Sequence, residues 1–211
     1  MFITFEGSEG SGKTTQIALL ADFLRGRGCG VLTTREPGGT EIGEQVRAVL
    51  HDVHNRSLTP TAEVLLYFAS RAQLVEELIR PALAAGQFVV CDRYADSSLA
   101  YQGYGRGLDL DDLRQLARIA TGGLQPDLTL LLDVESGAGL ARRSSAGAEM
   151  NRMDLQAAVF YERVRQGYHA LAAAEPARWR IINANRPLEE IQANIRRHVL
   201  ERLSPGRPER G

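Results

Sequence analysis

A glycine-rich segment near the start of the chain contains its only lysine. Residues 7–14 read Gly-Ser-Glu-Gly-Ser-Gly-Lys-Thr, a full match to the spacing G-x-x-x-x-G-K-[ST]. Small residues let backbone N–H groups converge on phosphate oxygens, and the helix that follows adds its dipole. Lys13 would neutralise the β- and γ-phosphates of a nucleoside triphosphate, and the Thr14 hydroxyl would bind Mg²⁺. The other Lys or Arg positions are all arginine, which favours a compact ammonium over a broad guanidinium here.

Charged residues also follow two later apolar segments. Arg35 comes after residues 31–34, and Asp92 and Arg93 come after residues 88–91. Ligands of open parallel sheets bind beyond the carboxyl ends of the strands, so these side chains are predicted beside the glycine loop. Asp92 is predicted to hold Mg²⁺, usually through water, although it could instead cap a helix from Ala95 onward. Arg93 would repel an isolated Mg²⁺, which favours a second phosphate, on an acceptor, over a surface salt bridge.

Two further groups of residues are ambiguous from spacing alone. Tyr67 and Arg71 are four residues apart on a predicted helix and therefore share a face. An aromatic plate beside a guanidinium suits a flat, hydrogen-bonding ring, but a core tyrosine with a solvated arginine has the same spacing. Arg142, Arg143 and Arg152 bracket a Ser/Gly/Ala stretch at 144–148. Arginines on a mobile loop can close over a transferring phosphoryl group, and a charged exposed loop is the simpler interpretation.

The elements that must position these residues alternate along the chain. Apolar, β-rich runs predict five strands, at residues 2–5, 31–34, 88–91, 128–134 and 179–182. Helical spacing and caps predict helices at 14–27, at 41–51, from Thr59-Pro60 to the region of Arg80-Pro81, from a cap near Asp109, and at 188–203. Residues 103–107 are expected to form a glycine-rich loop. Strands that alternate with helices indicate an α/β doubly wound fold.

Composition limits the function classes. A chain of 211 residues fits one α/β domain, and a net charge of −1 gives no sign of a broad nucleic-acid-binding face. Cys29 and Cys91 lack metal-ligand spacing and are interpreted as reduced structural thiols. No apolar run approaches the ~20 residues of a membrane span. Residues 1–5 already read as a strand, which leaves no room for a signal or transit peptide, so we expect a cytoplasmic protein without a membrane partner.

The chain resembles the thymidylate kinases, nucleoside-monophosphate kinases of the P-loop class, along nearly its whole length. The resemblance rests on residues 5–16, 34–40, 69–73, 92–94, 97–103, 126–129 and 132–134. The glycine loop identifies only a superfamily. Residues 35–40 (Arg-Glu-Pro-Gly-Gly-Thr), together with residues 92–103, are much more specific. The resemblance implies a P-loop NTPase three-layer fold, with a five-stranded parallel sheet flanked by helices and a mobile, arginine-bearing lid.

The resemblance also implies an activity and a set of roles. The reaction would be Mg²⁺-dependent phosphorylation of dTMP by ATP, in a homodimer whose single kinase domain covers residues 1–203, with a lid at about 141–154 and a flexible tail at 204–211. The ATP site would be formed by Gly7, Ser8, Glu9, Gly10, Ser11, Gly12, Lys13, Thr14 and Thr15. The dTMP site would be formed by Glu9, Arg35, Tyr67, Arg71, Arg93, Ser98, Tyr101 and Gln102. The catalytic charges would be Lys13, Arg93, Arg142, Arg143 and Arg152, and the metal residues Thr14 and Asp92.

The sequence departs from the family pattern at two places. The lid normally ends in an Asp-Arg-x-Glu-like run, whereas residues 151–154 read Asn-Arg-Met-Asp, so Arg142, Arg143 and Arg152 all stay candidates for the phosphate contact. Residues 183–185, predicted near the donor base, read Asn-Ala-Asn in place of a more usual Asp-Ala, which leaves the donor-base preference open. The alternatives are a P-loop kinase for another nucleotide or nucleoside, and an ATP-binding regulatory module. Against a guanine-nucleotide switch, the chain contains no Asn-Lys-x-Asp motif, since Lys13 is its only lysine.

Overall fold

The computed structural model describes residues 1–134, 152 and 158–203. Its sheet consists of five parallel strands in the order β2-β3-β1-β4-β5. The strands are β1 (Phe2–Glu6), β2 (Val31–Arg35), β3 (Phe88–Asp92), β4 (Leu128–Asp133) and β5 (Trp179–Asn183). The helices of the described residues are α1 (Lys13–Arg25), α2 (Glu41–His51), α3 (Pro60–Leu74), α4 (Arg80–Ala84), α5 (Ala95–Ser98), α6 (Leu110–Thr121), α8 (Ala158–Ala174) and α9 (Leu188–Leu203). The α/β fold with a five-stranded parallel sheet is therefore confirmed.

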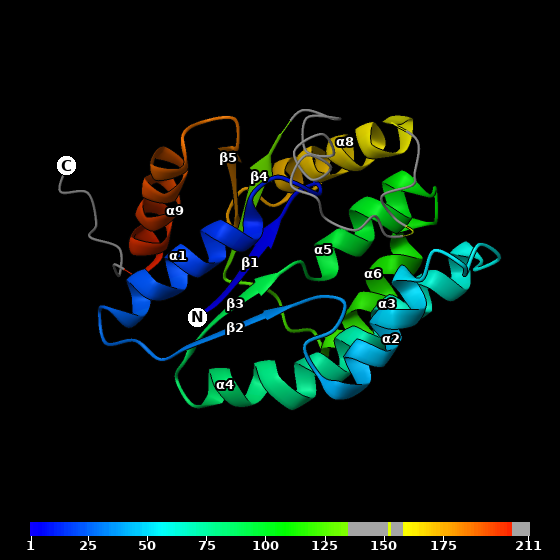
Figure 1. Ribbon diagram of the computed structural model, residues 1–211, viewed down its shortest axis with the longest axis horizontal. Helices are drawn as coiled ribbons and strands as arrows, with labels where there is room; N and C mark the ends of the chain where they lie inside the picture. Colours follow the sequence, from blue (N-terminus) through cyan, green and yellow to red (C-terminus); the bar gives the residue numbers. More distant parts are fainter. Residues whose placement is uncertain (135–151, 153–157, 204–211) are drawn as a thin grey trace.

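The molecule has three layers. Helices α1 and α9 cover one face of the sheet, and the remaining helices cover the other (Figure 1). Side chains on a strand alternate between the two faces. Ile3 and Phe5 of β1 accordingly pack with α1 and α9, whereas Phe2 packs with the helical segment from Leu74 to Ile79. Because both faces are covered, the central strands β1, β3 and β4 are mostly apolar and almost entirely buried, as sequence patterning predicts for a buried parallel sheet.

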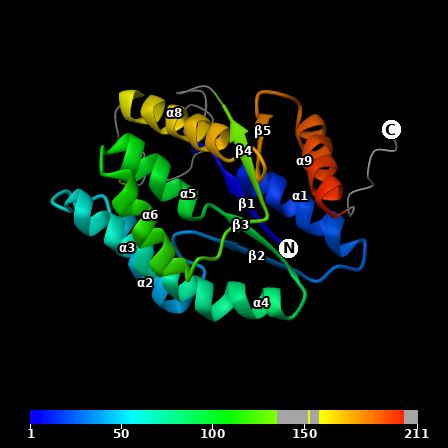
Figure 2. The ribbon, with the colours of Figure 1, turned by 180° about the vertical axis from the view of Figure 1, so that it is seen from behind.

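The strand order places the site. The chain leaves β1 for β2 and β3 on one side of the sheet and then crosses to β4 and β5 on the other, a path that Figure 2 shows from behind. The carboxyl ends of β1 and β3 thus meet where the strand order reverses. Phe5 pairs in register with Asp92, and the Arg93 amide donates to the Phe5 carbonyl at 2.9 Å. The glycine loop and the Asp92-Arg93 pair therefore lie beside each other, as predicted.

Helix starts follow the predicted caps. The Thr59 hydroxyl accepts from the Ala62 amide, and Pro60 occupies the first turn of α3. The Asp109 carboxylate accepts from two amides at the start of α6. These short polar side chains satisfy N–H groups that have no partner within the helix.

The prediction of a glycine-rich loop at residues 103–107 is wrong in part. Residues Leu99–Gly105 form a π-helical segment, η2, that continues α5. A β-carbon on Gly103 would lie 2.5 Å from the Leu110 side chain, and one on Gly105 would lie 2.6 Å from the Phe160 ring. These two glycines serve close packing against α6 and α8, a role that composition cannot distinguish from a turn. A second π-helical segment, η1 (Val75–Ile79), joins α3 to α4, so the predicted long helix continues past Pro81.

Two expectations about the protein as a whole can be compared with the described residues. No described helix has both the length and the apolar content needed to cross a bilayer. Cys29 and Cys91 are free thiols, and burial raises the pKa of Cys91 well above its usual value. Cys91 is therefore a structural thiol, as interpreted from the sequence.

Candidate active site

A cavity of about 460 Å³ lies at the carboxyl ends of β1, β2 and β3. One wall is the glycine loop and the first turn of α1, represented by residues 9–15. The facing walls come from the ends of β2 and β3 and from helices α2, α3 and α5 with η2. They contribute Arg35, Glu36, Pro37, Arg47, His51, Tyr67, Arg71, Asp92, Arg93, Ser97, Ser98, Tyr101 and Gln102. The cavity therefore brings the predicted phosphate loop and the predicted acceptor residues together.

The glycine loop owes its shape to positive backbone φ angles. Gly7 has φ 133°, and a β-carbon there would lie 2.5 Å from the Leu132 carbonyl of the neighbouring strand β4. Gly12, with φ 88°, is the N-cap of α1. Residues other than glycine are strained in this conformation. The loop can therefore turn tightly and still present its amides at the helix N-terminus, where an anion binds favourably.

Lys13 lies beneath this loop. Its side chain is buried, and Nζ donates to the carbonyl oxygens of Gly7 at 3.2 Å and Ser8 at 3.0 Å. Burial, and next the nearby Arg93, lowers the pKa of Lys13, against the effect of Asp92 and Glu9. The ammonium is thus fixed next to the place where phosphates would bind, with carbonyl partners that a phosphate oxygen can replace.

Asp92 and Thr14 both line the cavity. The Asp92 Oδ1 atom is buried and has no hydrogen-bond partner among the described residues. A buried carboxylate oxygen without a partner is costly unless a ligand satisfies it. The described residues contain no group of three or more His, Cys, Asp or Glu side chains that could hold a metal. This donor set suits Mg²⁺ bound to nucleotide phosphates, because Mg²⁺ usually takes one or two carboxylates and fills its remaining positions with water and phosphate oxygens.

Arg93 has a left-handed backbone, with φ 69°, and it lines the cavity. Nη2 donates to Glu9 at 2.8 Å and to the Tyr101 hydroxyl at 3.1 Å. Nη1 donates to the hydroxyls of Ser97 at 3.3 Å and Tyr168 at 3.2 Å. The alternative of an exposed surface salt bridge is wrong, because only 12% of the Arg93 side chain is exposed.

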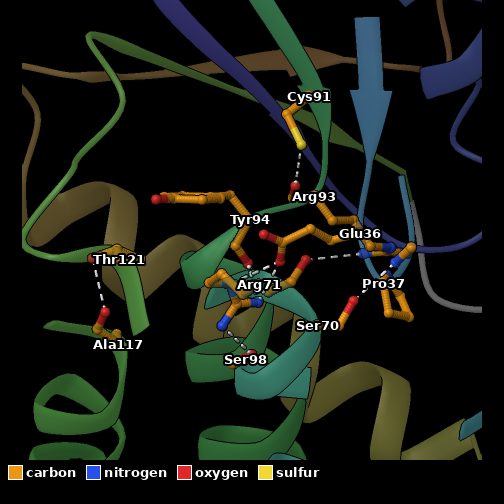
Figure 3. A network of polar contacts seen from close by, with 12 residues as sticks. Glu36, Pro37, Ser70, Arg71, Cys91, Arg93, Tyr94, Ser98, Ala117 and Thr121 are labelled. Carbon is orange, nitrogen blue, oxygen red and sulfur yellow. Dashed lines mark hydrogen bonds and ion pairs between the residues drawn. The ribbon is translucent and has the colours of Figure 1, made fainter. Parts of the chain in front are cut away.

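Arg71 is buried in a network that Figure 3 shows, with its side chain 1% exposed. Its Nε donates to Glu36 at 2.7 Å, Nη1 to the Ser98 hydroxyl at 3.0 Å and Nη2 to the Tyr94 carbonyl at 3.0 Å (Figure 3). Burial works against the charge, but Glu36 more than offsets it and raises the pKa of Arg71. The alternative of a solvated arginine is therefore wrong.

Tyr67 is partly exposed and lines the cavity one turn before Arg71. Burial of its hydroxyl, and next the Glu63 carboxylate, raises the pKa of Tyr67 to about 12. The phenol is therefore neutral at physiological pH and can act as an uncharged aromatic wall. The neighbouring Phe68 is buried in the core, and the Arg71 guanidinium lies over its ring, 4.8 Å from the ring centroid.

Two other predicted acceptor residues line the cavity while their side chains donate to glutamates. Arg35 lines the cavity and its Nη2 donates to Glu44 at 2.8 Å, an exposed pair. Gln102 also lines the cavity, but its amide donates to Glu63 at 2.9 Å. Gly7 and Ser8 contribute carbonyl groups to Lys13 and are not among the residues that line the cavity.

Arg152 is held away from the cavity lining. Its Nη2 donates to Glu63 at 2.6 Å and its Nε donates to the Leu50 carbonyl at 2.9 Å. Burial alone would raise the pKa of Glu63, but hydrogen bonds from Gln102 and Arg152, with Arg106 nearby, lower it. Arg142 and Arg143, the remainder of the predicted lid at 141–154, and the predicted tail at 204–211 lie outside the described residues.

Sequence reasoning missed several residues of the site. Arg47 and His51 of α2 line the cavity. They are four residues apart and so share one face of the helix, but polar residues on a helix face usually indicate contact with solvent, so the sequence did not suggest a site role. Burial lowers the pKa of Arg47, and Arg35 adds to this effect. Glu36 and Glu63 hold arginines from other elements, and no local pattern in the sequence announces such tertiary contacts.

Comparison with known proteins agrees with this geometry. The sequence model of the thymidylate kinase family matches residues 5–195. A thymidylate kinase from Thermomicrobium roseum is 53% identical over 206 residues, which cover 98% of this chain and 97% of that protein. One from Geotalea uraniireducens is 50% identical over 210 residues, which cover 97% of this chain and 99% of that protein. The crystal structure of thymidylate kinase from Ehrlichia chaffeensis superposes with a TM-score of 0.76 at 34% identity, over 94% of this chain and 98% of that one. The chain belongs to the thymidylate kinase family.

Proposed function

We propose that the protein transfers the γ-phosphoryl group of ATP to dTMP and so produces ADP and dTDP. The observation that carries this proposal is the shared cavity, which joins the Lys13 loop to a pocket lined by Arg93, Arg71 and Tyr67. A phosphate-binding loop beside a second, arginine-lined pocket suits a donor and an acceptor better than a single nucleotide. The family membership agrees with it.

We propose that the acceptor site recognises dTMP by its phosphate, its sugar and its base. Arg93 and Arg35 bind the phosphate, and Glu9, which already pairs with Arg93, addresses the 3′-hydroxyl of the sugar. The base lies against Tyr67, with Arg71 and Ser98 at its edge and with Tyr101 and Gln102 beside it. Arg71 is held rigidly by Glu36, Ser98 and Tyr94, so its geometry is set before the ligand arrives.

The chemistry requires position and charge more than proton transfer. An oxygen of the dTMP phosphate is already ionised, so it can attack the γ-phosphorus in line without a strong general base. Lys13 and the loop amides neutralise the phosphates of the donor, and Arg93 holds the attacking oxygen. The Asp92 carboxylate and the Thr14 hydroxyl are the residues that would hold Mg²⁺. When bound, the ion supplies charge neutralisation on the β- and γ-phosphates.

The predicted lid arginines complete the proposal. We assign Arg142 and Arg143 to the transferring phosphoryl group, because the Arg152 guanidinium is already bound to Glu63 and Leu50. Arg152 could contact the phosphoryl group only if its ion pair with Glu63 breaks when both nucleotides are bound. Its present contacts support a role as an anchor between its segment and the walls formed by α2 and α3.

We also propose that the protein acts as a cytoplasmic homodimer. Large apolar side chains are exposed on α2 and α3, which lie side by side in Figures 1 and 2, and on α6: Ile42, Val49, Leu65 and Ile119. Leu74 of the same helix as Leu65 is fully buried, so α3 has separate core and outward apolar faces. A Leu65→Glu variant should elute as a monomer in light-scattering chromatography, whereas an unchanged mass would remove this face from the interface.

The experiment that tests the activity is ADP release with a panel of acceptors: dTMP, dUMP, dCMP and dGMP. The proposal expects the highest kcat/KM with dTMP. Best turnover with another monophosphate would assign the protein to a different acceptor. Slow ADP release that no acceptor increases would indicate an ATP-binding regulatory module.

A further inference from the structure

Glu6 is a buried carboxylate that the roles above do not use. It is the last residue of β1, directly before the glycine loop, and it is fully buried. Its Oε1 accepts from the Tyr94 amide at 2.9 Å, and its Oε2 accepts from the hydroxyls of Ser97 at 2.5 Å and Tyr168 at 2.8 Å. All three are neutral donors. A carboxylate buried with neutral partners is costly, and this cost directs attention to what its three donors contact.

Each of the three donors also adjoins Arg93. The Ser97 and Tyr168 hydroxyls that donate to Glu6 both accept from Arg93 Nη1, at 3.3 and 3.2 Å. A hydroxyl that donates its proton to a carboxylate presents its lone pairs to the next donor, and such chains strengthen one another. Arg93 Nη1 can only donate, so each hydroxyl accepts from it and has one proton left to donate, which Glu6 Oε2 accepts. Glu6 thereby orients the two hydroxyls so that their lone pairs face the Nη1 edge of the guanidinium.

The backbone of Arg93 depends on the same strand. Its φ of 69° is unfavourable for a residue with a side chain. The Arg93 amide donates to the Phe5 carbonyl, and the next amide, of Tyr94, donates to the Glu6 carboxylate, both at 2.9 Å. The last two residues of β1 therefore bracket the strained residue.

We propose that Glu6 is a positioning residue, which holds the Nη1 edge and the backbone of Arg93 so that the Nε–Nη2 edge meets the acceptor phosphate. This inference rests on the proposed function, because it takes the ligand of Arg93 to be a phosphate. The Nη2 atom donates to Glu9 and to the Tyr101 hydroxyl, which both line the cavity, so the acceptor phosphate would replace one of these two partners. A guanidinium fixed along one edge can bind two phosphate oxygens with the other.

The position has a measurable consequence because Glu6 titrates near neutrality. Burial, and next the nearby Asp96, raises the pKa of Glu6 to about 7, against the lowering effect of Arg93. The titratable and charged groups that face Glu6 from the surrounding elements are Lys13, Arg71, Cys91, Arg93, Asp96 and Tyr168. A protonated Glu6 would donate to one of the two hydroxyls, which would then have to turn its own proton away from Glu6, and this turn would disturb its contact with Arg93 Nη1. Acceptor binding should therefore weaken as pH falls through about 7.

The test compares the wild type with Glu6→Gln at several pH values. The neutral amide keeps an acceptor for the Tyr94 amide but donates toward the hydroxyls, so it resembles protonated Glu6. Above neutral pH we expect KM for dTMP to rise about tenfold, with a smaller change in kcat. The ratio of kcat/KM between the two proteins cancels the titration of dTMP itself. That ratio should fall toward one at acid pH, with a midpoint near 7.

Controls separate positioning from stability. Ile195→Val, on the buried face of α9, should lower the melting temperature and leave the pH profile unchanged. Tyr168→Phe removes one of the two hydroxyls that connect Glu6 to Arg93 Nη1, and it should raise KM for dTMP by a smaller factor than Glu6→Gln does. The effects of the two substitutions should not be additive in the double variant. If Glu6→Gln does not fold, Tyr168→Phe carries the test alone: an unchanged KM and an unchanged pH profile would overturn the proposal. A ratio that stays flat with pH in a folded Glu6→Gln protein would overturn it as well. Absence of turnover in the wild type would instead refute the proposed function, and melting-temperature shifts with added dTMP would then replace KM as the readout.

Discussion

Arg71→Met separates the structural and ligand-binding roles of the buried Glu36–Arg71 pair. The substitution keeps the apolar stem and removes the guanidinium, which leaves Glu36 buried without its cation. Removal of one partner from a buried ion pair costs about 3–5 kcal/mol. For a domain of this size that loss corresponds to a fall in melting temperature on the order of 10 °C. KM for dTMP should also rise, because the base edge loses its donor.

The double variant Glu36→Gln/Arg71→Met distinguishes the two effects. The neutral amide no longer requires a cation, so most of the lost melting temperature should return while KM for dTMP stays high. Calorimetry and steady-state kinetics on the same preparations provide both values. A double variant that recovers neither quantity, or a single variant with wild-type stability, would refute the assignment of Glu36 as the partner that Arg71 neutralises.

The same pair predicts a pH dependence. Burial raises the pKa of Glu36 even in the presence of Arg71, and loss of the guanidinium should raise that pKa further. An acid with a raised pKa in the folded state contributes stability below its unfolded pKa, and this contribution is lost as pH rises through the folded pKa. The stability deficit of Arg71→Met should therefore be smaller near ~pH 5.5 than near ~pH 8. A deficit that does not change with pH would contradict this sign.

Three further predictions concern other parts of the site. Lys13→Arg keeps the charge but cannot place a broad guanidinium where Nζ meets the Gly7 and Ser8 carbonyls, so kcat should fall about 10²–10³-fold in a folded protein; kcat near the wild-type value would contradict this. Gly105→Ala places a methyl group 2.6 Å from the Phe160 ring and should cost about 1–3 kcal/mol of unfolding free energy; in Gly30→Ala, the control, the methyl meets only the flexible Gln87 side chain, and equal losses would argue against the packing role. Arg152→Met should lower the melting temperature, because Glu63 and the Leu50 carbonyl lose a donor, and should change kcat only slightly. A loss of kcat as large as that of Lys13→Arg would instead indicate that Arg152 is a catalytic residue.

The sequence was most informative where function is encoded locally. The glycine loop, the Thr59 and Asp109 caps and the apolar strands each occupy a few consecutive residues, so their pattern predicts both structure and position. The topology of a parallel sheet then brings strand ends together without further information, which is why Asp92 and Arg93 could be placed beside the loop.

Tertiary partners could not be predicted in this way. A glutamate that reads as a solvated charge becomes buried only because residues far away in sequence supply donors, as Tyr168 does for Glu6 and Arg152 does for Glu63. Gly105 likewise has the local sequence of a turn residue, and only its contact with the distant Phe160 shows that it is required for packing. Contacts between distant segments carry no local sequence signal.

The central claim is direct transfer of a phosphoryl group between two nucleotides in one cavity. The most direct measurement is mass spectrometry of the products formed from dTMP and ATP whose γ-phosphoryl group carries heavy oxygen. Direct transfer predicts that the labelled group appears in dTDP, in equal amount to ADP. Labelled inorganic phosphate together with unchanged dTMP would contradict it.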